Sequence, residues 1–291
     1  MSPADAFEEH RAHLLRVGYR ITGRLADAED AVQEAWLRWA AQDEPPRDPR
    51  AWLATVVGRI CLDRLRSSAA RRERYVGPWL PEPLVTAPDD DGPLAAVVRH
   101  EDVRMAAMVV LERLSAPQRV ALVLHDALDL PFAEIGEVLG CPEATARQHA
   151  ARARRIVADA AVPPRPRTAE QQAVLAAFAD AMAHADLPAL LEVLHPDVVL
   201  LNDGGGEVAA ARRPVVGADK VARLLLGLLA RHGPGMLAGE VVLVNGELGL
   251  RTADPAAVTV LAVADGRVVG VHGVLNPAKL APGTPRRSPG R

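Results

Sequence analysis

The residues best suited to chemistry in this sequence are four arginines and a glutamine near position 150. Arginine and glutamine side chains can make paired hydrogen bonds to guanine and adenine edges in a DNA major groove. The cluster therefore indicates DNA recognition, although a solvated basic helix face would have the same composition. The candidate base-contacting residues are Arg147, Gln148, Arg152, Arg154 and Arg155.

The segment around these residues has the pattern of a helix-turn-helix. Phe132, Ile135 and Leu139 recur at helical spacing, and Gly140 is suited to end that helix. Pro142 is tolerated where the next helix begins, and that helix can bury its alanines while turning its arginines outward. In such motifs the second helix enters the major groove, so the pattern predicts a DNA-binding domain.

Charge is segregated along this chain of 291 residues, although its net charge is only −3. Residues 47–74 hold eight arginines against three acidic residues, a net charge of +5. Residues 143–167 hold six arginines against two acidic residues, a net charge of +4. Two basic segments in an otherwise acidic chain suit a protein that contacts a polyanion at two places, with solvated helix faces as the alternative.

The two cysteines, Cys61 and Cys141, stand in apolar contexts without a CxxC motif or clustered histidines. We expect buried thiols in a reducing compartment, and therefore no disulfide, no metal site and no cofactor. The N-terminal segment is acidic where a signal peptide would be basic, and no apolar run approaches the roughly 18 residues of a membrane span. These features predict a cytoplasmic protein without membrane contact.

The order of the predicted elements gives the fold class. Two helical blocks are separated by a proline-rich linker, and a third block begins with two helices and continues in short apolar strands. Asp265-Gly266 between the last two strands suits a type I′ hairpin turn. The sequence predicts a multidomain protein with two all-α domains and an α+β domain whose sheet is mostly antiparallel. The predicted parts are residues 1–75 (helical), 76–97 (linker), 98–161 (helical), 168–280 (α+β) and 281–291 (disordered tail).

Three further segments lie upstream of the helix-turn-helix or directly before it. They are Asp27–Trp36, which has an acidic face, Trp52–Arg66, and Leu114–Arg119. In this order and spacing they resemble the sigma-70-type initiation factors of bacterial RNA polymerase. Because the gap between the helical blocks is too short for a middle domain, the chain resembles the extracytoplasmic-function sigma factors, which have only regions 2 and 4.

Three short motifs extend the resemblance over nearly the whole chain: Trp79–Pro83, Asp203–Gly206 and Asn276–Leu280. Together they resemble the subfamily that carries a fused SnoaL-like domain. The resemblance implies a cone-shaped, nuclear transport factor 2-like domain that regulates the sigma module in cis, with no separate anti-sigma factor required. The residues it implies in this regulation are Trp79, Leu80, Pro81, Glu82, Pro83, Asp203, Gly204, Gly205, Gly206, Asn276, Pro277, Lys279 and Leu280.

The resemblance also implies two partners. One is core RNA polymerase, contacted at the clamp coiled coil of the large subunit and at the flap, and the other is promoter DNA. Carboxylates opposite a basic coiled coil would steer the association. The implied residues are Asp30, Gln33 and Glu34 for polymerase; Trp52, Arg59, Asp63, Arg66, Arg71 and Arg72 for the −10 element; and Arg147, Gln148, Arg152, Arg154 and Arg155 for the −35 element.

Two other functions remain open from the residues alone. One is a helix-turn-helix regulator with a ligand-sensing domain, and the other is a cyclase- or isomerase-like enzyme fused to a helical module. No pair of acid–base candidates can be placed at a common reacting atom, and Asp186 is suited to cap a helix. We therefore expect a protein that is not an enzyme. The acid–base candidates are His184, Asp186, His195, Asp197, Asp203 and His272.

Overall fold

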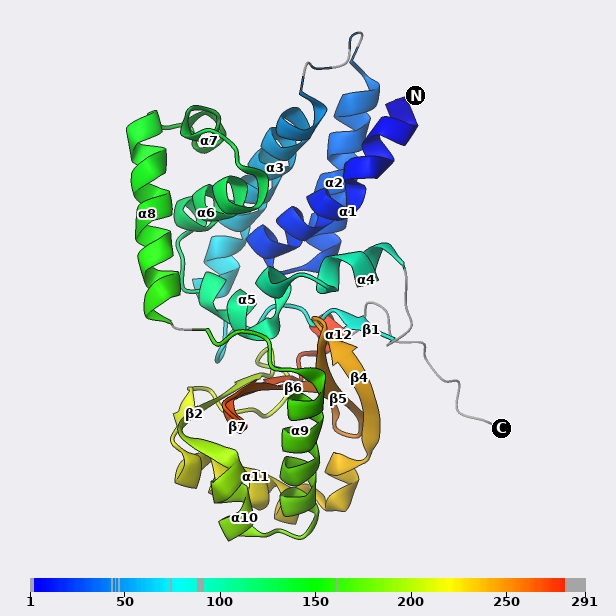
Figure 1. The fold of residues 1–291 in the computed structure, drawn as a ribbon, viewed down its shortest axis with the longest axis vertical. Helices are drawn as coiled ribbons and strands as arrows, with labels where there is room; N and C mark the ends of the chain where they lie inside the picture. Colours follow the sequence, from blue (N-terminus) through cyan, green and yellow to red (C-terminus); the bar gives the residue numbers. More distant parts are fainter. Residues whose placement is uncertain are drawn as a thin grey trace, which may run out of the picture. The chain divides into compact units, whose positions relative to one another are not determined.

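The computed structural model describes residues 3–42, 44, 46, 48–73, 75–87, 92–160 and 162–280. The chain divides into two compact units (Figure 1). Unit 1 holds residues 1–74 and 91–162, and unit 2 holds residues 75–90 and 163–291. The predicted tail, 281–291, lies outside the described residues. Among the described helices, none combines the length and the apolar character needed to cross a membrane.

The described part of unit 1 is helical. Its first half is a bundle of three helices whose buried faces carry small and branched apolar residues, such as Ala28, Ala31, Leu53 and Val57, each 0% exposed. These residues recur at helical spacing, which gives each helix one apolar stripe to bury. The bundle consists of α1 (Pro3–Thr22), α2 (Leu25–Ala40) and α3 (Pro49–Glu73).

The second half of unit 1 contains the predicted helix-turn-helix. Ser115 and Gln118 form a capping box that fixes the start of α6, and Val120, Val123 and Leu124 bury the helix in the core. Cys61 of α3 is buried, Cys141 is partly exposed, and both are free thiols. The elements are α4 (Pro93–Val98), η1 (Glu101–Val103), α5 (Met105–Leu111), α6 (Ala116–Leu128), α7 (Phe132–Leu139) and α8 (Glu143–Asp159).

Unit 2 is built around one seven-stranded sheet in the order β1-β4-β5-β6-β7-β2-β3. The β2–β7 pair is parallel and every other pair is antiparallel, which confirms the predicted α+β class with a mostly antiparallel sheet. The strands are β1 (Val85–Thr86), β2 (Leu194–Asp203), β3 (Val215–Val216), β4 (Gly239–Val244), β5 (Glu247–Ala253), β6 (Ala256–Ala264) and β7 (Arg267–Val274).

Helices cover one face of this sheet (Figure 1). Their core with the sheet includes Met182, Leu190, Val221, Leu200 and Val271, all nearly or fully buried. Strand residues alternate between this face and the opposite one, which carries Asp203 and His272. The remaining elements of unit 2 are α9 (Thr168–Ala183), α10 (Leu187–Val193), α11 (Ala218–His232), η2 (Pro234–Leu237) and α12 (Pro277–Leu280).

Two of the tight turns between described strands have positive φ at both of their residues. Asp265 and Gly266 have φ of 49° and 70°, which confirms the predicted turn with positive φ at both positions. Asn245 and Gly246 join β4 to β5 with φ of 52° and 77°. Asp, Asn and Gly tolerate this left-handed region, so both dipeptides fit the twist that a two-residue hairpin requires.

Candidate nucleic-acid interface

The five candidate −35 residues lie on α8, and all five are exposed. Arg147 has the most defined position among them. Its Nη2 donates to Glu143 Oε1 at 2.5 Å, and its guanidinium lies 5.4 Å from the centre of the Phe132 ring. Phe132 in turn stacks on His125, with ring centres 4.2 Å apart. A carboxylate and an aromatic ring therefore hold Arg147 in the N-terminal half of α8, the part of a recognition helix that meets base edges.

The other four candidates differ in their contacts. Arg154 Nη2 donates to Asp126 Oδ1 on α6 at 2.6 Å, which ties this side chain to the body of the domain. Gln148, Arg152 and Arg155 make no hydrogen bond or ion pair with the residues that the structure describes. These three side chains can reach bases or phosphates without breaking a contact, whereas Arg154 must first leave Asp126.

The turn between α7 and α8 depends on two glycines. Gly140 ends α7 with a φ of 69°, in the region that favours glycine. A Cβ at Gly136 would lie 2.7 Å from Cys141 O, so a side chain there would push the turn away from α7. Small residues on the inner face then let α8 pack closely on α6 and α7. Those fully buried residues are Ala146, Ala150 and Ala153.

The candidate −10 residues of α3 lie on two sides of the helix. Trp52 is half-buried, with its ring centre 5.9 Å from that of Trp39, so it contributes to the core of the bundle. Arg59, Asp63 and Arg66 are exposed. Arg71 and Arg72 belong to the last turns of α3, and their side chains lie outside the described part of the structure.

Within unit 1, the helix that carries the −10 candidates packs against the helix-turn-helix. Arg59 Nη2 lies 3.4 Å from Glu137 O and 3.8 Å from Glu137 Oε2 on α7. A Cβ at Gly58 would lie 2.9 Å from Leu124 Cδ1 on α6, so the two helices approach closely there. Arg59, a −10 candidate, is therefore in contact with the helix-turn-helix.

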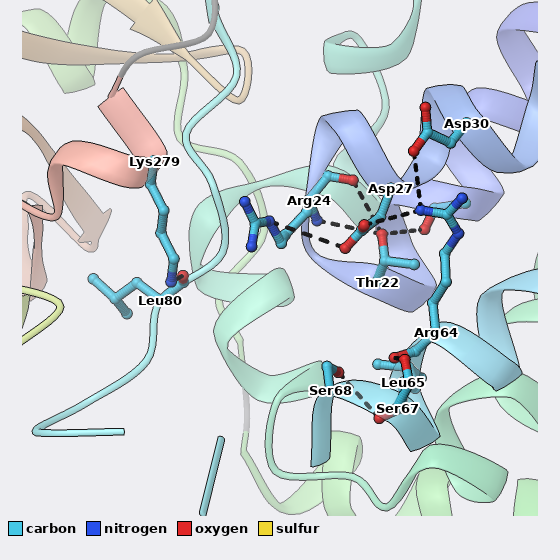
Figure 2. A network of polar contacts seen from close by, with 11 residues as sticks. Thr22, Arg24, Asp27, Asp30, Arg64, Leu65, Ser67, Ser68, Leu80 and Lys279 are labelled. Carbon is cyan, nitrogen blue, oxygen red and sulfur yellow. Dashed lines mark hydrogen bonds and ion pairs between the residues drawn. The ribbon is translucent and has the colours of Figure 1, made fainter. Parts of the chain in front are cut away.

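The three candidate polymerase residues share one side of α2. Asp30 and Gln33 are exposed and Glu34 is half-exposed. Asp30 Oδ2 accepts a hydrogen bond from Arg64 Nη1 of α3 at 3.1 Å (Figure 2). Leu37 continues this side of the helix and is 61% exposed. The sequence patterns did not single out Leu37 or Arg64, although Leu37 completes the helical spacing i, i+3, i+4, i+7 that begins at Asp30.

In unit 2, the linker is bound to the C-terminal domain through Asp203, which is 0% exposed. Asp203 Oδ2 accepts from Leu80 N at 2.8 Å and from Lys279 Nζ at 2.6 Å, and Tyr75 OH donates to its other oxygen. Lys279 Nζ also donates to Leu80 O at 2.5 Å, a contact that can be followed in Figure 2. One carboxylate and one ammonium group thus bring the three short sequence motifs together.

Further contacts surround this cluster. Asn276 Nδ2 donates to Tyr75 OH at 2.7 Å, and the Trp79 ring centre lies 3.6 Å from Lys279 Nζ in a cation–π contact. A Cβ at Gly205 would lie 2.6 Å from Asn276 Cγ. The Asn276 side chain therefore fits against this turn only because residue 205 is a glycine without a side chain. Of the other candidates, Pro81, Glu82, Pro83 and Gly204 are buried, Leu280 is half-buried, and Gly206 and Pro277 are exposed.

The sequence patterns did not single out two residues that hold the linker, Tyr75 and Asn245. Tyr75 had been assigned to the end of the first helical domain. Asn245 is fully buried, and its Oδ1 accepts from Leu84 N at 3.0 Å while its own N donates to Leu84 O at 2.8 Å. The Asn245-Gly246 dipeptide is a strong hairpin signal and would have located the turn. No local signal marks its partner, Leu84.

The acid–base candidates of unit 2 have local structural contacts. Asp186 caps α10 by accepting from Ala189 N at 3.0 Å, as its position before Pro188 predicted. The Asp203 carboxylate is bonded to Tyr75, Leu80 and Lys279. His272 is 6% exposed, and burial lowers its pKa from 6.5 to about 4. Within the described ranges, no group of three or more His, Cys, Asp or Glu is arranged to hold a metal ion.

Comparison with known proteins assigns the class of the helical part. Residues 6–71 match the family model of sigma-70 region 2, and residues 104–157 match that of sigma-70 region 4. Unit 1 thus contains both sigma-70 region 2 and sigma-70 region 4.

Relatives that align over the whole chain then assign the family. The chain is 52% identical to the ECF RNA polymerase sigma factor SigJ of Mycobacterium tuberculosis, over 94% of this chain and 91% of that protein. It is 33% identical to the probable ECF RNA polymerase sigma factor SigI of the same species, over 95% and 94% of the two chains. The crystal structure of M. tuberculosis SigJ matches with a TM-score of 0.79 at 49% identity, over 95% of this chain and 97% of that one. The chain belongs to the extracytoplasmic function RNA polymerase sigma factors, which confirms the resemblance found in its motifs.

Proposed function

We propose that this chain directs core RNA polymerase to specific promoters and that its C-terminal domain controls this activity in cis. The exposed side of α2 holds the polymerase, through the basic clamp coiled coil of its large subunit. Helix α3 contacts the −10 element and α8 contacts the −35 element. Family membership supports the assignment, and the acidic side of α2 and the exposed arginines of α8 are consistent with it.

The observation that carries the cis control is the way the linker is built into the C-terminal domain. Residues 75–87 follow the helices with the −10 candidates and precede those with the −35 candidates. Within unit 2, Val85 and Thr86 pair with β4 as an edge strand. Leu80 and Leu84 are bonded to Asp203 and Asn245. A linker held in this way has a fixed span, whereas a free coil would sample a wide range of lengths.

The span matters because both DNA elements must be contacted together. B-DNA rises about 3.4 Å per base pair, so elements about 25 base pairs apart lie roughly 85 Å apart. In unit 1, however, α3 and α7 are in contact through Arg59 and Glu137. The contact between α3 and α7 has to break before the chain can bind both DNA elements. The C-terminal domain holds the linker and so limits how far these two helices can separate.

The two alternative functions have less support. An ordinary helix-turn-helix regulator has no use for an acidic polymerase-binding face. In the C-terminal domain, Asp186 caps a helix and Asp203 binds the linker, which favours a regulatory over a catalytic role for these groups. A covalently attached regulator acts at an effective concentration on the order of millimolar, so even weak contacts of the domain would be populated.

Run-off transcription with core polymerase tests the proposal. Promoters with spacers of different length between the −10 and −35 elements should be transcribed with a narrow length preference by the full chain. Removal of residues from Asn276 onward, which takes away Lys279, should broaden that preference. Removal from Ala281 onward leaves the cluster in place and serves as the matched control. If every truncation down to residue 167 transcribes like the full chain, cis control is wrong; if the full chain gives no transcript, the sigma activity itself is wrong.

A further inference from the structure

Helices α2 and α3 of unit 1 are joined by one arginine and two carboxylates (Figure 2). Arg64 Nη1 lies 3.1 Å from Asp27 Oδ1 and 3.1 Å from Asp30 Oδ2. Asp27 and Asp30 are three residues apart on α2, so both face the same side of that helix. Without a cation between them, two carboxylates at this spacing would repel each other.

The side chains of Arg64, Asp27 and Asp30 differ in how far they are exposed to solvent. The side chains of Arg64 and Asp27 are 30% and 34% exposed, whereas that of Asp30 is 61% exposed. Asp27 therefore anchors the arginine near the bundle, and the arginine reaches outward to Asp30. Asp30 Oδ1 is bonded to none of the described residues, so it can accept a hydrogen bond from a partner while Oδ2 is held.

We infer that Arg64 is a positioning residue for polymerase binding: it acts through Asp30, whose carboxylate it orients toward a basic side chain of the polymerase. The inference rests on the proposed polymerase-binding face of α2. A held carboxylate binds a basic partner with less loss of side-chain freedom than a mobile one. Arg24 Nε lies 4.0 Å from Asp27 Oδ2, so Asp27 faces two arginines. Among the described residues Asp30 is paired with Arg64 alone and is the most exposed carboxylate of the cluster, which suits it to a basic partner.

The position of Arg64 on α3 links polymerase binding to the −10 helix. Its neighbours Asp63 and Arg66 are 78% and 56% exposed and are −10 candidates. One helix therefore presents Arg64 to the polymerase-binding helix and the adjacent side chains to solvent. A shift of α2 on docking would be transmitted to the −10 helix through this arginine.

The test is equilibrium binding of fluorescently labelled full-length chain to core polymerase, with four variants and the wild type. These are Arg64→Gln, Arg64→Lys, Asp30→Asn and the double variant of Arg64→Gln with Asp30→Asn. Arg64→Gln should weaken binding roughly three- to fivefold, the upper range for an exposed ion pair. Arg64→Lys should restore part of the loss. Because Arg64 acts through Asp30, the double variant should bind no more weakly than Asp30→Asn alone.

Arg223→Gln is the matched control, since it removes the same charge from another exposed arginine–aspartate pair, Arg223 with Asp219 in unit 2. It should leave polymerase affinity unchanged. Thermal unfolding of each variant separates lost affinity from lost folding. An unchanged affinity for Arg64→Gln, or purely additive effects of the two single changes, would overturn the inference while leaving the α2 face in place. An unchanged affinity for Asp30→Asn would instead remove the polymerase face, and the inference with it.

Discussion

Lys279 Nζ lies 2.6 Å from Asp203 Oδ2, and the two side chains are only 3% and 0% exposed. Burying an ion pair costs several kcal/mol of desolvation per ion, so such a pair survives only with further hydrogen bonds. Here Leu80 N and Gly205 N donate to Asp203, and Lys279 donates to Leu80 O. The pair therefore holds the Leu80 segment against the domain, because the N–H and the C=O of this one residue bond both charges.

Removing one partner of this pair should destabilise unit 2 strongly. Lys279→Met leaves the Asp203 carboxylate buried without its cation, and breaking a buried pair typically costs about 3–5 kcal/mol. The measurement is the unfolding free energy from urea titration. The control is Asp219→Asn, which breaks the exposed 2.9 Å pair with Arg223 and should have much less effect on stability, because both groups are in solvent. Equal losses in the two variants would show that burial of the Lys279–Asp203 pair has no energetic consequence.

The turn residue Asn245 has two separable roles, a backbone role and a side-chain role. Asn245→Gly keeps the positive φ but leaves the Leu84 N–H without its acceptor, which should cost about 1–3 kcal/mol. Asn245→Ala loses the same bond and adds about 1 kcal/mol of left-handed strain. Hydrogen exchange at the Leu84 amide measures both changes. If Asn245→Gly leaves the protection of that amide unchanged, the side chain does not hold the linker.

Sequence patterns predicted the elements that are locally encoded. The helical spacing around Ile135 and the Asp265-Gly266 turn depend on residues close together in the chain, and both were found as expected. Helix α11 was not predicted, although its buried residues, Val221, Ala222 and Leu225, recur at helical spacing. Strand β1 has only two residues, too few to show any alternation.

Candidate site residues were predictable only as parts of motifs, because their partners lie far away in sequence. Leu84 and Asn245 are 161 residues apart, and Arg64 is 34 residues from Asp30. Such contacts are set by how the elements pack and by strand register, and a single sequence contains no direct measure of either. The motifs located Asp203 and Lys279, but their charge pairing appears only in the fold.

Arg147 and Arg154 should differ in their contribution to −35 recognition. Arg147→Ala removes a side chain capable of bidentate contact to guanine, and discrimination against a mutated −35 element should fall by about 1–3 kcal/mol. Arg154 is tied to Asp126, so Arg154→Ala should change discrimination much less. Binding of the polymerase holoenzyme to both promoters provides the measurement. Loss of core polymerase binding in Arg147→Ala, with discrimination unchanged, would refute the assignment.

The buried His272 should make unit 2 sensitive to acid. Burial lowers its pKa from 6.5 to about 4, and its Nδ1 has no hydrogen-bond partner in the described part of the chain. The unfolded chain therefore binds a proton below about pH 6.5 that the folded chain does not bind until about pH 4, so stability falls as the pH falls through this window. Between pH 7.5 and 5.5 the loss should be about 1 kcal/mol. Hydrogen exchange of the β6 and β7 amides measures it, and His272→Leu should reduce the slope by that amount. An identical pH slope in the variant would show that His272 is not the group responsible.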